Sequence, residues 1–125
     1  MTIEIGDVNN KIDQDILESF RWVCDAIVTK TNLIGHLYYS FTTMSIYLLF
    51  NADVCKEKKD IFEDILKGLN NWIKDRALDE YMETNLFTKK YNDNTYGTNI
   101  KFGMKENLSN DKIQEFKTVY KLCFI

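Results

Sequence analysis

The only imidazole in the chain belongs to His36, so catalytic or metal sites that need two histidines are excluded. His36 follows Gly35 in an apolar segment, where a histidine hydrogen-bonded near a helix start is the expected role. A histidine that acts as a general base needs partners in reach, and the sequence supplies no recognisable set. These observations predict a non-enzymatic protein that uses no cofactor.

Motifs for phosphate binding and nucleophilic catalysis are absent. The sequence contains no GxxxxGK[ST] loop, no GxGxxG turn and no GxSxG elbow. Residues 92–94 with Gly97 partly match a calcium-binding loop, but Gly103 occupies the twelfth position, where a bidentate acid must stand. Classical nucleotide binding, α/β-hydrolase chemistry and a calcium loop are therefore not expected.

Carboxylates are abundant and recur at helical spacing. Glu57, Asp60 and Asp64 share one helical face, as do Asp75 and Asp79. Acidic residues one turn apart could hold a divalent cation, but opposite an apolar face they are typically the solvated side of a helix. We interpret them, together with tyrosines expected in a loop, as a surface that binds another protein. The predicted partner-binding residues are Asp60, Asp64, Asp75, Asp79, Glu80, Glu83, Tyr91 and Tyr96.

Size and charge favour the same interpretation. The chain has 125 residues and a formal net charge of −3, and its basic residues are dispersed apart from the short cluster Lys56, Lys58 and Lys59. Nucleic acid is therefore disfavoured as a ligand, whereas the acidic faces would steer a basic protein. We hypothesise a small acidic immunity or antitoxin-type inhibitor that neutralises a basic toxin, such as a nuclease, by direct binding.

Two alternative functions remain open. One is a small-molecule or lipid-binding helical domain in which His36, Tyr38, Phe41 and Trp72 line a cavity. The other is a helical bundle that interferes with host signalling, which makes the same surface prediction and differs only in its partner. A filled core with an acidic aromatic surface would favour a protein partner, and an interior pocket would favour a small ligand.

A cytoplasmic location is expected. The three cysteines, Cys24, Cys55 and Cys123, form an odd set without a CxxC pair, which favours free thiols in a reducing compartment. The first ten residues lack the basic start and apolar block of a secretion signal. The long apolar run, residues 33–50, is too polar and slightly too short to span a membrane comfortably, so no membrane partner is predicted.

The segments that carry most of these residues are predicted to be helices. Apolar residues recur every three or four positions over residues 10–30 and 53–74, and Ser109 or Asn110 is placed to cap a last helix. Residues 32–51 are apolar almost all round. Their length favours a central helix, while the abundance of Tyr, Phe, Thr and Ile leaves a buried strand as the alternative.

The remaining segments complete a mainly α prediction. A further helix is expected around residues 78–87, and the Asn- and Gly-rich residues 91–110 are typical of turns. Alternating residues near 98–104 allow one short β-hairpin or strand, paired with Ile3 and Ile5. We therefore predict a single helical domain over residues 1–125, built as a bundle of about four to five helices.

Overall fold

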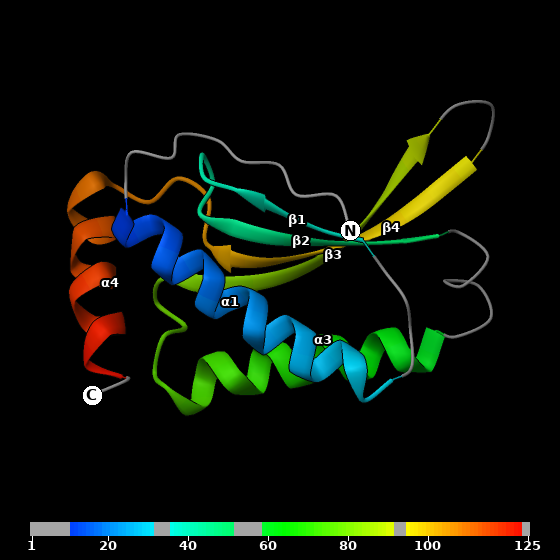
Figure 1. Cartoon of the computed structure of the whole chain (residues 1–125), viewed down its shortest axis with the longest axis horizontal. Helices are drawn as coiled ribbons and strands as arrows, with labels where there is room; N and C mark the ends of the chain where they lie inside the picture. The colour runs from blue at the N-terminus through cyan, green and yellow to red at the C-terminus, as the bar shows by residue number, and fades with distance from the viewer. Residues whose placement is uncertain (1–10, 32–35, 52–58, 92–94, 124–125) are drawn as a thin grey trace.

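The computed structural model describes residues 11–31, 36–51, 59–91 and 95–123, which fold as helices packed on an antiparallel sheet. The elements are α1 (Lys11–Thr29), β1 (His36–Ser40), β2 (Ser45–Asn51), α3 (Lys59–Asp75), β3 (Met82–Tyr91), β4 (Thr95–Met104) and α4 (Asn110–Leu122). The sheet order is β1-β2-β4-β3. Figure 1 shows α1 and α3 against one face of the sheet and α4 at one end. The described residues therefore form an α+β fold, and the predicted all-helical bundle is wrong.

The largest correction concerns the apolar segment predicted as a central helix. Its described part forms β1 and β2, which pair from His36 with Leu49 to Ser40 with Ser45 around a four-residue turn. That turn shifts the buried positions from odd numbers, such as Leu37, to even numbers, such as Leu48. The shift produces spacings of three and four residues across the hairpin, which mimic the period of a helix.

The helix predicted around residues 78–87 is also absent, because α3 ends earlier and a strand follows. Ala77 adopts a left-handed backbone with φ 55°, and the Leu78 amide donates to the Ile73 carbonyl at 3.0 Å. This arrangement stops the helix and caps its carbonyls. The strand expected near residues 98–104 belongs to β4, which pairs with β2 and β3, and its predicted pairing with Ile3 and Ile5 lies outside the described residues.

Three helices do follow the apolar periodicity of the sequence. α1 and α3 lie within or close to the two segments predicted from their spacing. The third, α4, begins after Ser109, whose hydroxyl accepts the Lys112 amide at 3.2 Å. The capping residue and the amphipathic pattern together determine these elements locally.

The core lies between the helices and one face of the sheet. Phe20 of α1 packs edge-on against Phe102 of β4, with ring centroids 5.4 Å apart, and against Tyr120 of α4 at 5.5 Å. Phe20 and Phe102 are fully buried. Gly103 faces the opposite side, where a Cβ would stand 2.5 Å from the Met44 carbonyl oxygen, so only glycine fits beside β2. This packing fixes which face of α1 is left outside.

Candidate functional site

The outward surface of α1 presents a large aromatic side chain among carboxylates. Asp15, Glu18, Trp22 and Asp25 follow one another at spacings of three, four and three residues, which places them on one side of the helix. Trp22 is 69% exposed, whereas Phe20, two residues earlier, is fully buried. We call these four residues the α1 surface.

A hydrogen-bonded network holds the carboxylates beside Trp22 in place. The Tyr39 hydroxyl of β1 donates to one Glu18 oxygen at 2.7 Å, and Arg21 donates to the other at 3.2 Å. Arg21 also donates to the Tyr39 hydroxyl at 3.3 Å, and its Nε lies 3.5 Å from Asp25. The network ties α1 to β1, so the side chains around Trp22 are held before any partner arrives.

The network also changes two ionisation equilibria. Burial, together with the hydrogen bond to Glu18, raises the pKa of Tyr39 to about 12. The hydrogen bond with Tyr39 raises the pKa of Arg21 above its ordinary value, with Glu18 and Asp25 adding to the effect. The phenol therefore stays protonated and the guanidinium stays charged at neutral pH, which preserves the network.

The predicted partner-binding acids on α3 do not form one surface. Asp60 and Asp64 are exposed near the start of α3, and Asp75 is exposed at its end. Asp60 and Asp75 are fifteen residues apart, or about 22 Å along a helix axis. Asp79 and Glu80 are also exposed, and they lie in the turn that follows α3, close to Asp75 in the sequence. The predicted set is thus split along the helix.

The other predicted residues lie elsewhere. Glu83 of β3 is half-buried and pairs with Gly103, so it belongs to the sheet face opposite α1 and α3. Tyr91 ends β3 opposite Thr95, and Tyr96 pairs with Lys90 close to the same hairpin end. Their side chains lie outside the part of the structure that is described. Glu80 forms a hydrogen-bonded ion pair with Lys112 of α4 and contributes to holding α4.

The four residues of the small-ligand alternative do not line one cavity. Trp72 packs edge-on against Phe102 with ring centroids 5.6 Å apart. Tyr38 stacks on Tyr47 at 5.0 Å, on the face of the sheet away from the helices. His36 is exposed at the first position of β1. Within the described ranges, no group of three or more His, Cys, Asp or Glu side chains is placed to hold a metal ion.

Sequence reasoning missed Trp22, although a signal was present. The apolar stripe of α1 contains Ile16, Phe20 and Cys24, and Trp22 falls out of phase with it, beside Glu18 and Asp25. A tryptophan on the polar side of an amphipathic helix is the signal that identifies this surface. Tyr39 could not be found this way, because its approach to Glu18 depends on how β1 lies against α1.

Comparison with known proteins gives no family model, no curated protein and no solved structure that matches this chain. None of the described helices combines the length and apolar composition needed to cross a membrane.

Proposed function

We propose that this chain is a non-enzymatic protein that binds a basic protein partner through the α1 surface. The observation that carries the proposal is Trp22, which is 69% exposed on an otherwise polar helix face. Buried tryptophans are among the side chains that contribute most to protein interfaces, because they offer a large contact area at little entropic cost. In the free chain, this indole has no such cover.

Charge around the indole favours a cationic partner. Asp15, Glu18 and Asp25 contribute three carboxylates, and Arg21 is the one guanidinium beside them, so the local balance is negative. Lysine or arginine side chains of a partner could lie over the Trp22 ring and beside these carboxylates. The acids after α3 then act at a distance, by attracting the same partner.

More specifically, we propose an immunity or antitoxin-type inhibitor that binds and blocks a basic toxin, such as a nuclease, in the cytoplasm. The acidic balance of the whole chain supports this form, since it favours fast association with a cationic protein. Cys24 and Cys123 are both free thiols, which is compatible with a reducing compartment.

The test is co-purification of the tagged chain from its source cell, expressed together with the neighbouring genes. We expect one basic protein to be retained in a one-to-one ratio and to be released by about 0.5 M salt, because the contacts are partly ionic. The Trp22→Ser variant should no longer retain this protein. Leu122→Ser is the matched control, since Leu122 is 63% exposed but lies on α4.

Two results would contradict the proposal. If Trp22→Ser retained the same protein at the wild-type level, the α1 surface would not be part of the interface. Equal loss with Leu122→Ser would show that binding responds to any change of exposed apolar surface, which is a different mechanism.

A further inference from the structure

The sheet ends in two edge strands of different length. β1 has five residues and pairs with β2 only, whereas β3 has ten and pairs with β4 only. The free side of an edge strand carries a row of backbone N–H and C=O groups that can pair with a further strand. Short length protects β1 against such pairing, so β3 is the edge with room for a partner.

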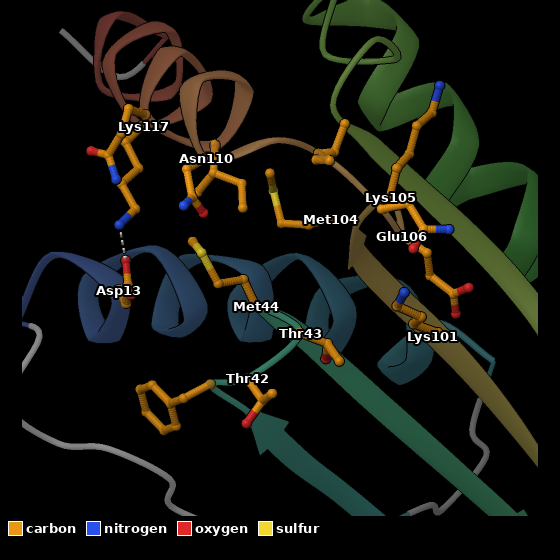
Figure 2. A pocket seen from close by; sticks show the side chains of 15 residues that line it. Asp13, Thr42, Thr43, Met44, Lys101, Met104, Lys105, Glu106, Asn110 and Lys117 are labelled. Atoms are coloured by element: carbon orange, nitrogen blue, oxygen red, sulfur yellow. Dashed lines mark ion pairs between the residues drawn. The ribbon is translucent and has the colours of Figure 1, made fainter.

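The start of β3 lies against α4. The Tyr81 hydroxyl, one residue before β3, donates to Glu115 of α4 at 2.6 Å, and Tyr81 and Met82 are both buried. α4 is in turn joined to α1, since the Lys117 ammonium lies 2.8 Å from an Asp13 carboxylate oxygen (Figure 2). The edge that remains for a partner therefore begins after Met82.

The hydrogen-bonding phase of β3 shows which of its backbone groups point away from β4. The Lys105 N–H donates to the Tyr81 C=O at 2.8 Å. These two residues continue the register in which Met82 stands opposite Met104. Because bonded positions alternate in an antiparallel ladder, odd-numbered residues of β3 bond to β4. The even-numbered residues direct their N–H and C=O groups outward.

Two side chains in the middle of β3 have features that a further strand would satisfy. Leu86 stands opposite fully buried Ile100, on the face toward the helices, yet it is 46% exposed. The Thr84 hydroxyl oxygen is buried and has no hydrogen-bond partner within the described part of the chain. A neighbouring strand would give Leu86 an apolar contact and the hydroxyl a hydrogen-bonding group.

The sequence of β3 is complementary to itself when two copies run in opposite directions. With Leu86 of one copy opposite Leu86 of the second, Thr84 stands opposite Thr88, and Glu83 stands opposite Lys89. Two-fold symmetry makes the last two pairs occur twice. Threonine pairs and pairs of opposite charge stabilise antiparallel strands. This register also sets the outward-pointing, even-numbered residues directly opposite one another, as the hydrogen bonds require.

We propose that two copies of this chain associate through β3, so that their four-stranded sheets form one continuous antiparallel sheet. A two-fold axis passes beside Leu86, and the two Leu86 side chains cover each other. Thr88 of the second copy provides the Thr84 hydroxyl with a partner. α1 packs mainly on β2, two strands from this edge, so each copy keeps its α1 surface and the dimer does not depend on the proposed function.

The test is the molar mass of the full chain in solution, measured by sedimentation equilibrium over a range of concentrations. We expect twice the mass of one chain. Glu83→Lys and Lys89→Glu should each weaken the dimer about tenfold or more, because each replaces two pairs of opposite charge by two pairs of like charge. Glu63→Lys, at an exposed position of α3, is the matched control and should dimerise as wild type does.

Mixing the two charge variants tests the register itself. Glu83→Lys and Lys89→Glu should associate weakly alone and form a mixed dimer together, because each variant then offers the charge that the other needs at both contacts. Circular dichroism of each variant checks that it is folded.

A cysteine beside the two-fold axis gives a measurement that leaves the charges intact. In a background with Cys55→Ser and Cys123→Ser, Leu86→Cys should form a disulfide-linked dimer on mild oxidation. Opposed Cα atoms of a hydrogen-bonded pair lie about 5.5 Å apart, within the range that a disulfide spans. Asn70→Cys, at an exposed position of α3, should stay unlinked.

Three results would each overturn the proposal. The first is a wild-type mass of one chain at every concentration, which would favour a strand of another protein as the occupant of this edge. The second is a mixture of the folded charge variants that associates no more than either alone. The third is equal crosslinking of Leu86→Cys and Asn70→Cys.

Discussion

α1 and α3 lie against the same face of the sheet, yet their outward surfaces differ in kind (Figure 1). Both helices bury apolar side chains toward the sheet, among them Leu17 of α1 and Leu69 of α3. Outward, α3 presents charged and polar groups such as Asp60 and Asp64, whereas α1 presents Trp22 among carboxylates held by a network. Both helices carry exposed charges. The feature that distinguishes a binding surface from a solvated one is an exposed aromatic side chain beside charges that a network holds in place.

The inward faces should be equally important for stability. Leu17→Ala and Leu69→Ala each remove a fully buried side chain, and each should lower the free energy of unfolding by about 2–5 kcal/mol. Urea denaturation monitored by circular dichroism measures both. A large loss for one helix only would show that the two helices do not share one core.

The outward faces should differ most in partner binding. Trp22→Ser should weaken the complex by about 2 kcal/mol, or about 30-fold in Kd, because a central aromatic contact is lost. Asn70→Ser, at an exposed position of α3, should leave Kd unchanged. Titration calorimetry with the co-purified partner measures both Kd values. A larger loss of affinity for Asn70→Ser than for Trp22→Ser would show that the interface lies on α3.

The network behind Trp22 should have a smaller, measurable effect on stability. Tyr39→Phe removes the hydroxyl that bonds Glu18 and Arg21 and should lower the free energy of unfolding by about 1 kcal/mol. Glu63→Gln, on the exposed side of α3, should change it by less than about 0.5 kcal/mol. Equal values in urea denaturation would mean that the α1 network is as weak as an ordinary exposed charge.

Alkaline pH should weaken the α1 side of the molecule. Burial raises the pKa of Tyr120, which bonds Ser19 of α1, to about 12, and burial with the Glu18 bond raises that of Tyr39 to the same value from 10.0. The folded chain then keeps protons that the unfolded chain loses, so this stability is complete below pH 10 and is lost between 10 and 12.

The measurement is the free energy of unfolding from about pH 8 to about pH 12. Its decline above pH 10 should be shallower in Tyr39→Phe and shallower again when Tyr120→Phe is added. An unchanged slope in the double variant would assign the decline to other groups.

Neutralising the acids of α3 should change only the rate of association, and only slightly. Asp60→Asn combined with Asp64→Asn should slow association with a basic partner about two- to threefold at low salt and leave the dissociation rate unchanged, because distant charges act on encounter. Stopped-flow mixing at two salt concentrations measures this change. A faster dissociation rate would place these residues inside the interface.

Local sequence predicts the exposure of Trp22 but not the burial of Lys101. The phase of the α1 pattern places Trp22 outside the apolar stripe, so its exposure follows from residues close to it in the chain. Lys101 offers no such signal. It alternates with Ile100 and Phe102 in a way that predicts a solvated side chain, yet it is only 4% exposed on β4, which lies between β2 and β3.

Helices α1, α3 and α4 could be predicted from local sequence, because their apolar period and the Ser109 cap depend on residues within a few positions of one another. That residues 36–40, 45–51, 82–91 and 95–104 pair into a sheet is visible only once the chain is folded. Ile46 lies opposite Phe102 in β4, and such a pairing joins positions more than fifty residues apart. A strand gains its stability from partners distant in the chain, and a short turn can reset the phase of burial, so the local pattern resembled a helix until the strands were paired.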